Sequence, residues 1–335
     1  MVFPIIIILL ALLFDFYNGM NDAANSIATV VSTRVLTPFR AVLWAAFFNF
    51  VAAFVFGTAV AKTIGAGLVD ASVVDYQIIF SALIGAILFT SMCTHFGLPI
   101  SVSHSIIGGL VGAVLIKVGP ASIIFSGFIK VMLFIFLAPI MGYVISYFFS
   151  IIILWLVKNS SPRTVDKYFR KLQLVSAALF SLSHGANDAQ KTMGIITMVL
   201  VLMANGGDPT LIGKSFNVPF WVVITSHSVI AFGTMVGGWK VIKTLGMRMT
   251  KLTPFGGFSA ETSAGITIVI ATLFGIPVST THTITGAITG VGSLKGFSAV
   301  RWGVARNILW AWVLTIPFSA TVAAFIYWFT VTFLK

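Results

Sequence analysis

Long apolar runs are the feature of this chain that most restricts what it can fold into. They include residues 41–61, 78–93, 131–157, 219–236 and 307–335, and charged residues make up only 8% of the 335 positions. A helix needs about 20 mostly apolar residues to cross the hydrocarbon core of a bilayer. Inside a bilayer, backbone polar groups must be satisfied within the protein. The sequence therefore predicts an all-α, polytopic transmembrane protein.

Two sequence blocks occur twice, in the same order. GMNDAAN at 19–25 matches GANDAQK at 185–191, and FGLPISVSHSIIGG at 96–109 matches FGIPVSTTHTITGA at 274–287. Repetition of this kind indicates two copies of one structural unit. The offset between the copies is 166 residues for the first block and 178 for the second, so the second copy has longer loops.

The repeats divide the chain into a first half at 1–157, a linker at 158–171 and a second half at 172–335. We expect about five spans in each half. Because five is odd, the second half enters the membrane from the opposite side, which gives the inverted repeat of many secondary transporters. The expected spans are roughly 3–33, 41–61, 78–96, 100–116 and 127–157, then 172–203, 219–239, 257–275, 278–294 and 303–333.

Basic residues concentrate in alternate loops. The loops at 34–40, 158–171, 239–254 and 295–306 hold fourteen Lys and Arg residues, and the remaining loops and the C-terminus hold five. Lys and Arg are enriched in cytoplasmic loops. We therefore expect these four loops in the cytoplasm and both termini outside. The net charge of +12 then reflects membrane topology, and no nucleic-acid partner is expected.

Charged residues in the middle of predicted spans mark a polar centre. Asp22, Asp188 and Lys191 lie there, and each costs about 2.5–3.5 kcal/mol to insert at a helix centre. Gly19 and Gly185 precede the aspartates and weaken a helix, so a helix break is expected at each. Unwound carbonyls and Asn or Asp side chains would form an oxygen-rich site suited to Na⁺ or a proton. The alternative is a structural role, with Asp188 and Lys191 neutralising each other.

The residues expected to bind cations are Asn21, Asp22, Asn25, Asn187, Asp188 and Glu261, with sodium ions at Asp22 and Asp188. Glu261 has no acidic counterpart in the first half, where Leu83 aligns, and a helix-capping role remains open for it. His184 directly precedes the second Gly-x-Asn-Asp copy, but a structural role is expected for this histidine.

The second repeated block predicts a helix N-terminus in each half. Pro99 and Pro277 disfavour helix in the residue before them, and the Ser and Thr residues that follow are good N-caps. A helix N-terminus offers free N–H groups that bind phosphate or sulfate, and inverted symmetry would bring the two termini together. The residues expected to bind the anion are Ser101, Ser103, His104, Ser105, Gln190, Lys191, Ser279, Thr280, Thr281, His282 and Thr283. Capping of a turn, with His104 and His282 bonded to carbonyls, is the alternative.

Charge balance predicts how the two sites interact. A phosphate anion beside Asp22 and Asp188 needs compensation in a medium of low dielectric constant. Bound cations would supply it, and the stabilisation would be reciprocal. Lys191, which aligns with Asn25 of the first half, is expected to add a fixed positive charge near the anion.

In these two duplicated signatures the chain resembles the inorganic phosphate transporter (PiT) family, whose repeated signature is G-A-N-D-x-x-N. The matching residues are Gly19, Asn21, Asp22 and Asn25, then Gly185, Asn187 and Asp188, and the second copy departs from the signature at Gln190 and Lys191. The resemblance implies phosphate import by symport with Na⁺ or H⁺, with Na⁺ favoured, and alternating access. It also implies a homodimer, no cofactor besides the coupling ion, and a compact prokaryotic form in the plasma or inner membrane.

The sequence also allows other functions. The same family includes sulfate permeases, and a passive anion channel would belong to a different class. An enzyme is not expected, because the chain has no H-E-x-x-H motif and no hydroxyl residue with a clear histidine base and an orienting acid.

Overall fold

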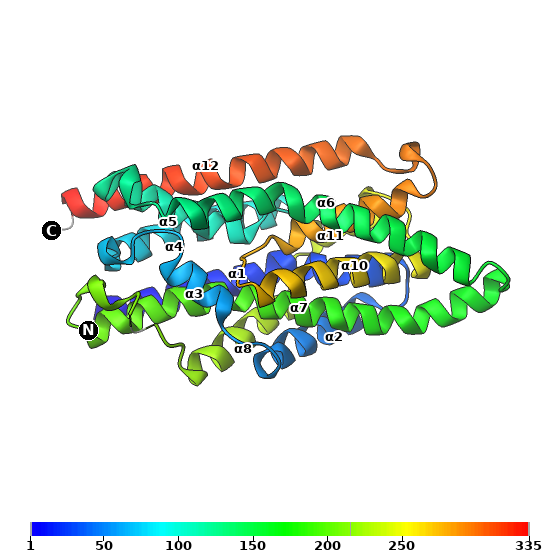
Figure 1. The fold of residues 1–335 in the computed structure, drawn as a ribbon, viewed down its shortest axis with the longest axis horizontal. Helices are drawn as coiled ribbons and strands as arrows, with labels where there is room; N and C mark the ends of the chain where they lie inside the picture. The colour runs from blue at the N-terminus through cyan, green and yellow to red at the C-terminus, as the bar shows by residue number, and fades with distance from the viewer. Residues whose placement is uncertain (1, 215, 334–335) are drawn as a thin grey trace.

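The computed structural model describes residues 2–214 and 216–333, and these residues are helical apart from turns, loops and one β-bridge between Val69 and Ile123. The first half contains α1 (Val2–Ser32), α2 (Pro38–Val51), α3 (Ala59–Ala66), α4 (Tyr76–Phe96), α5 (Val102–Val118) and α6 (Phe125–Leu156). The second half contains α7 (Pro162–Ala204), α8 (Phe220–Val236), α9 (Trp239–Arg248), α10 (Pro254–Leu273), α11 (Thr280–Ser293) and α12 (Trp302–Phe333). The predicted all-α class is confirmed (Figure 1).

Helix packing is reciprocal between the halves. The helix α1 packs against α4, α8 and α9, and its counterpart α7 packs against α10, α2 and α3. In the same way α5 packs against α12, and α11 packs against α6. Each half therefore lends helices to the other, as expected for two copies related by a twofold axis.

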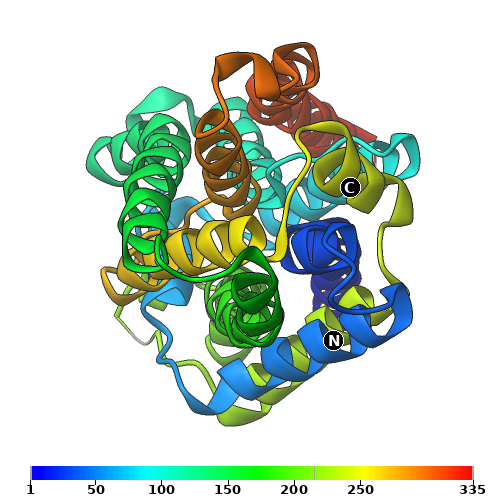
Figure 2. The same ribbon diagram turned by 90° about the vertical axis from the view of Figure 1, so that its right-hand side faces the viewer.

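The direction of the helices agrees with inversion of the two halves. Both termini lie at one end of the molecule and the turn between α6 and α7 lies at the other, so α1 and α7 run in opposite directions (Figure 1). Viewed from the end that holds this turn, α12 lies at the periphery (Figure 2). These features support the predicted inverted repeat.

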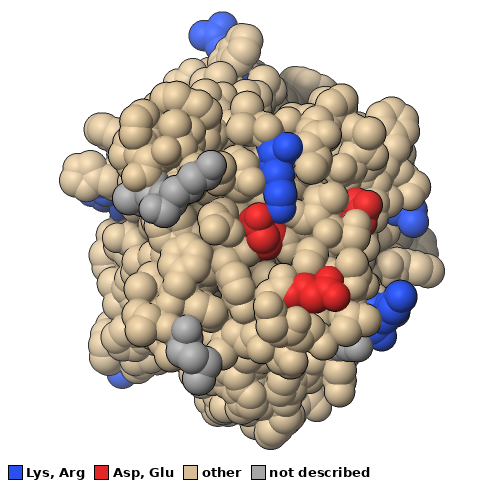
Figure 3. Space-filling model, turned by 90° about the vertical axis from the view of Figure 1, so that its left-hand side faces the viewer, with Lys and Arg blue, Asp and Glu red and all other residues tan. Residues whose placement is uncertain are grey.

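The basic loops gather at the end that holds the α6–α7 turn. Arg170 donates to the carbonyl of Arg34 at 3.0 Å, and the N–H of Arg301 donates to the carbonyl of Met249 at 2.9 Å. Leu154, at the end of α6, lies beside Lys251 and Lys295. The opposite end is mainly uncharged, and the few charged side chains near its centre are both acidic and basic (Figure 3).

Not every predicted span is a single straight helix. Among the described residues, four helices are long and apolar enough to cross a membrane, and six if each bent pair is one span. The bent pairs are α2 with α3 (83°) and α8 with α9 (70°), so residues 239–248, expected as loop, are helical. The helices α5 and α11 have 17 and 14 residues. At 1.5 Å per residue they are about 26 and 21 Å long, which is less than the thickness of the hydrocarbon core, about 30 Å.

The linker between the halves is also mostly helical. Only residues 157–161 separate α6 from α7, and residues 162–171 form the first turns of α7. Ser161 caps α7 by accepting from the N–H of Thr164, and Pro162 follows as the first helical residue. Serine and proline at these positions favour helix initiation, which explains why the helix begins inside the predicted linker.

The expected helix breaks at Gly19 and Gly185 are wrong, because α1 and α7 continue through both residues. The glycines instead allow close helix crossings. A Cβ atom at Gly19 would lie 2.2 Å from the carbonyl oxygen of Ile230, and one at Gly185 would lie 2.6 Å from that of Asn49. Packing thus decides these positions, and any cation ligands there are side chains on continuous helices.

We predict that Gly19→Ala lowers the free energy of unfolding by about 1–3 kcal/mol, the range typical of overpacking. Gly303→Ala is the matched control, since a Cβ atom there meets nothing within 4 Å. Melting temperatures of the purified variants in detergent check this. Equal melting temperatures for the two variants would contradict the close-crossing role.

Candidate functional site

The N-termini of α5 and α11 meet in the interior, as predicted. Ser101 and Ser279 cap the two helices by accepting from the N–H groups of His104 (3.3 Å) and His282 (3.2 Å). The imidazole ring centroids of His104 and His282 are 4.9 Å apart. Ser103 Oγ donates to the carbonyl of Val278 at 3.0 Å and so ties the start of α5 to the segment before α11.

The helix α1 joins this meeting point through hydroxyl groups of the second half. Thr280 and Thr281 donate to the two carboxylate oxygens of Asp22, at 3.1 and 3.4 Å. Asn25 Nδ2 donates to the same hydroxyl oxygens, at 3.2 and 2.9 Å. The N-terminus of α11 and a buried carboxylate therefore form one bonded unit.

The helix α7 adds a second buried carboxylate with its own cation. Lys191 Nζ lies 2.7 Å from Asp188 Oδ1 and 3.5 Å from the carbonyl oxygen of Val278. Lys191 and Asp188 are both fully buried. The i, i+3 ion pair that the sequence offered as an alternative interpretation is therefore present.

His184 lies between the two aspartates. Its Nε2 atom is 3.8 Å from Asp22 Oδ2 and 3.8 Å from Asp188 Oδ2. A structural role was expected for this histidine from the sequence, and that expectation did not include its position between the two carboxylates. One ligand atom from each of Asp22, His184 and Asp188 lies within 4.8 Å of the others, a spacing that a bound cation could bridge.

A chain of hydrogen bonds fixes the tautomer of His184. Thr234 donates to the carbonyl of Ile230, so its oxygen accepts from Asn49 Nδ2 at 2.9 Å. The Oδ1 atom of Asn49 then faces His184 Nδ1 at 3.1 Å and accepts a hydrogen bond from its N–H group. A neutral His184 consequently presents the lone pair of Nε2 to the space between the carboxylates.

The asparagines of the two signatures occupy equivalent settings. Asn21 Nδ2 donates to Thr94 at 2.9 Å, and Asn187 Nδ2 donates to Thr272 at 2.9 Å. The threonines align at the same offset of 178 residues as the second repeated block. Within the part of the chain that the structure describes, Oδ1 of each asparagine has no hydrogen-bond partner. Both halves thus keep a free amide oxygen that suits a hard cation.

Gln190 has contacts that its predicted role did not anticipate. Its Oε1 accepts from the N–H groups of Val60 (2.8 Å) and Ala61 (3.2 Å), and its Nε2 donates to Ala186 O. The side chain thereby caps the N-terminus of α3. Anion binding by Gln190 stays a prediction, and it would require Gln190 to give up part of this cap.

The remaining residues expected to bind the anion lie around the two helix N-termini, and only some of their polar atoms are hydrogen-bonded. Ser105 and Thr283 donate to carbonyls of Val102 and Ser279 at the start of their own helices. His282 stacks on Trp312 at a centroid distance of 3.7 Å. Among the described residues, His104 Nδ1 and His282 Nε2 are buried without a hydrogen-bond partner.

Glu261 belongs to a separate buried cluster. It accepts from Gln173 Nε2 at 3.0 Å and from Ser176 Oγ, while Thr33 donates to Gln173 Oε1. Ser176 precedes Asp188 by twelve residues on α7, a distance of about 18 Å along the helix. The structure therefore does not bring Glu261 to the central aspartates.

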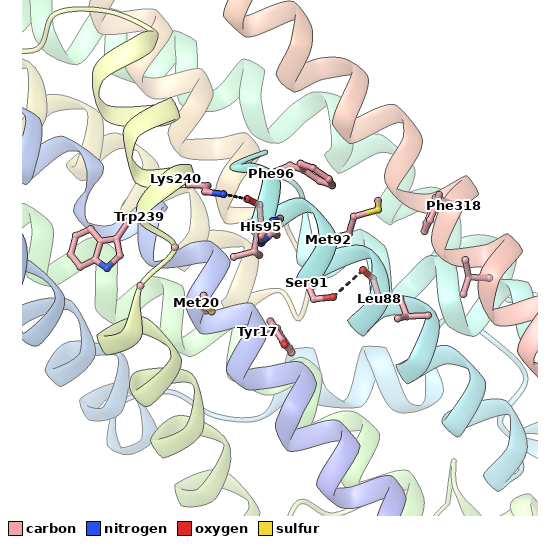
Figure 4. A pocket seen from close by; sticks show the side chains of 14 residues that line it. Tyr17, Met20, Leu88, Ser91, Met92, His95, Phe96, Trp239, Lys240 and Phe318 are labelled. Atoms are coloured by element: carbon pink, nitrogen blue, oxygen red, sulfur yellow. Dashed lines mark hydrogen bonds between the residues drawn. The ribbon is translucent and has the colours of Figure 1, made fainter.

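A cavity of about 840 Å³ approaches the site from the side of α1, α4 and α12 (Figure 4). Tyr17, Met20, His95 and Trp239 line it, and Lys240 donates to the carbonyl of His95 at 2.9 Å. Thr94, the hydrogen-bond partner of Asn21, is also in its wall. The cavity thus reaches Met20 and the hydrogen-bond partner of Asn21, which precedes Asp22 on α1.

Several site residues were not predicted. His184 had one signal, its position directly before the second signature. Asn49 and Trp312 had none, because their contacts join segments far apart in the sequence. Asp15 is also fully buried on α1, and its carboxylate oxygens lack a hydrogen-bond partner among the described residues.

We predict that Asp188→Asn destabilises the protein by about 3–5 kcal/mol, because it leaves the buried ammonium of Lys191 unpaired. The double variant Asp188→Asn/Lys191→Gln removes both charges and should recover most of this loss. Melting temperatures in a sodium-free buffer check the pair. A double variant no more stable than Asp188→Asn would contradict the ion pair.

Comparison with known proteins identifies the family. Residues 18–323 match the model of the phosphate transporter family. A probable low-affinity inorganic phosphate transporter of Rhizobium meliloti (strain 1021) is 52% identical, covering 97% of this chain and 96% of the relative. One of the same description from Bacillus subtilis (strain 168) is 41% identical, covering 98% and 97%.

A solved structure described as the sodium-dependent phosphate transporter has the same fold, with a TM-score of 0.91 and 28% identity. The match covers 99% of this chain and all of that one. Its fold agrees with the predicted transmembrane helical class. The chain is therefore a membrane protein, not an enzyme, and belongs to the phosphate transporter family.

Proposed function

We propose that this chain imports inorganic phosphate by symport with a cation, sodium rather than a proton, through alternating access. The observation that carries the proposal is the bonding of Thr280 and Thr281, at the N-terminus of α11, to the carboxylate of Asp22. An anion at the helix N-terminus and a cation at the carboxylate would share these hydroxyl groups. Each ion would then stabilise the other.

The anion would lie between the N-termini of α5 and α11. Both helices direct free N–H groups and the positive end of a dipole at the meeting point, which favours phosphate. Reorientation of nearby hydroxyl groups would add neutral donors, and Lys191 would add a positive charge. The proposed anion ligands are Ser101, Ser103, His104, Ser105, Gln190, Lys191, Ser279, Thr280, Thr281, His282 and Thr283.

Phosphate fits this site better than sulfate. Phosphate carries a proton at neutral pH and can donate a hydrogen bond, whereas sulfate only accepts. His104 Nδ1 and His282 Nε2 are buried imidazole nitrogens without partners among the described residues. In a neutral imidazole one nitrogen donates and the other accepts, and His282 Nδ1 faces the carbonyl of Ile135 at 3.4 Å, which leaves Nε2 as the acceptor. A site built to bond a substrate hydroxyl discriminates strongly against an analogue that lacks it.

The coupling cation would bind at Asp22. The free Oδ1 of Asn21 and the carboxylate oxygens of Asp22 are hard ligands on one helix, and oxygen ligands favour hard cations such as sodium. Asn25, bonded to the same threonine hydroxyls, would orient them. In the second half, Asn187 and Asp188 occupy the equivalent positions, where Lys191 already supplies a positive charge to Asp188.

The reciprocal packing of the halves supports alternating access. When the two copies of one unit around a central site exchange their conformations, the site opens to the opposite side of the membrane. The basic loops and the positive-inside rule favour an orientation with both termini outside the cytoplasm. We retain the homodimer as part of the proposal.

Uptake into liposomes tests this function. Labelled phosphate uptake is measured with an inward sodium gradient, an inward proton gradient or none, each with and without excess sulfate. We expect sodium-driven uptake that sulfate does not displace. Asp22→Asn should lower it at least about tenfold, whereas the exposed control Asp166→Asn should leave it unchanged. Uptake indifferent to both gradients would favour a channel, and displacement by sulfate would favour a sulfate permease.

Glu261 is proposed as a further cation ligand, apart from the central site. It is buried, and the basic side chains among the described residues form their ion pairs elsewhere, so a bound cation would compensate its charge. Glu261→Gln keeps the shape of the side chain, and we expect it to raise the half-saturating sodium concentration about tenfold, which corresponds to 1.4 kcal/mol. The phosphate KM at saturating sodium should not change. An unaltered sodium dependence would show that Glu261 has a structural role.

A further inference from the structure

The two halves of the site differ in how each aspartate is compensated. Asp22 accepts hydrogen bonds from Thr280 and Thr281. At the offset of 178 residues the counterparts of these threonines are Val102 and Ser103. Valine has no hydroxyl group, and Ser103 donates to the carbonyl of Val278. Asp188 therefore lacks the hydroxyl donors that Asp22 has.

A second difference compensates for the first. The residue three positions after the aspartate is Asn25 in the first half and Lys191 in the second. Asn25 donates to the threonine hydroxyls, while the ammonium of Lys191 lies 2.7 Å from Asp188 Oδ1. The two departures from the repeat thus occur together, and both act on the same carboxylate.

Part of the setting is shared by both halves, although His184 stands in the second half where the first half has Asn18, and Asp15 stands in the first half where the second has Ser181. Asn21 and Asn187 each bond an equivalent threonine and each keep a free amide oxygen. The difference that bears on charge at Asp188 is the ammonium of Lys191, which takes the place of Asn25. The ammonium is completely buried and sits where a cation would contact both Asp188 and the carbonyl of Val278.

We infer that Lys191 permanently holds the cation position of the second half, so that this chain couples phosphate to one cation fewer than its two repeated aspartates would require. This inference rests on the proposed symport and specifies its stoichiometry. The covalently attached ammonium replaces a cation that would otherwise bind and leave in every cycle. It also lies beside the anion position, where it can serve phosphate without a second coupling ion.

Lys191→Asn tests the inference, because it places in the second half the residue that the first half has. The measurement is the ratio of labelled sodium to labelled phosphate taken up by liposomes. We expect the ratio to rise by one sodium per phosphate, with a steeper dependence of uptake on sodium concentration. Lys167→Asn, the same change at an exposed position of α7, should keep the wild-type ratio. An unchanged ratio in Lys191→Asn would overturn the inference.

The double variant Asp188→Asn/Lys191→Gln removes the charge together with its compensation. It should keep the wild-type ratio of sodium to phosphate, and a ratio lower by one would mean that Asp188 binds a coupling cation after all. For variants that fold without transporting, the melting temperature is followed against the logarithm of the sodium concentration, since bound ligand stabilises the folded state. A slope in Lys191→Asn equal to that of the wild type would overturn the inference.

Failure of the proposed symport gives a different result. In that case wild-type uptake itself would ignore the sodium and proton gradients. The sodium dependence of the melting temperature does not require transport, so it would still show whether Lys191→Asn binds more sodium than the wild type.

Discussion

The contact between Asp22 and the hydroxyl groups of Thr280 and Thr281 is the interaction on which the rest of the site depends. It joins the middle of α1, in the first half, to the N-terminus of α11, in the second. A buried carboxylate is costly unless it is hydrogen-bonded or paired, and a helix N-terminus leaves N–H groups without partners. Each element thus supplies part of what the other lacks. Ions of both signs would complete the arrangement, and this is the physical basis of the coupling that we propose.

Close helix crossings place these groups. Because α1 and α7 are continuous, their polar side chains are held by regular backbone, and no unwound carbonyls are needed as ligands. The glycines at 19 and 185 bring α8 and α2 against the helices that carry the aspartates. Asn49, on α2, then fixes the orientation of His184 between the carboxylates. Packing at the crossings and the chemistry of the site are therefore linked through single side chains.

Features that depend on local sequence could be predicted, whereas features that depend on long-range contacts could not. The meeting of the α5 and α11 N-termini could be predicted, because proline, serine caps and the repeat are all visible in the sequence. The continuity of α1 through Gly19 could not be predicted. The sequence shows that a glycine weakens a helix, but it does not show that Gly19 packs closely against Ile230. Likewise, the i, i+3 spacing allowed the pairing of Asp188 with Lys191 as an alternative interpretation, whereas the position of His184 depends on a residue 135 positions away. Glu261 was grouped with the central ligands because nothing in the sequence shows the distance between them.

Equilibrium binding tests the central claim most directly. Phosphate affinity is measured on the purified protein by titration calorimetry across a range of sodium concentrations, and sodium affinity across a range of phosphate concentrations. If the two ions stabilise each other at Asp22 and the α11 N-terminus, each must raise the affinity for the other by the same factor. We expect that common factor to be at least about tenfold, or 1.4 kcal/mol. Phosphate affinity that is independent of sodium, and in turn of any other coupling cation, would contradict the account.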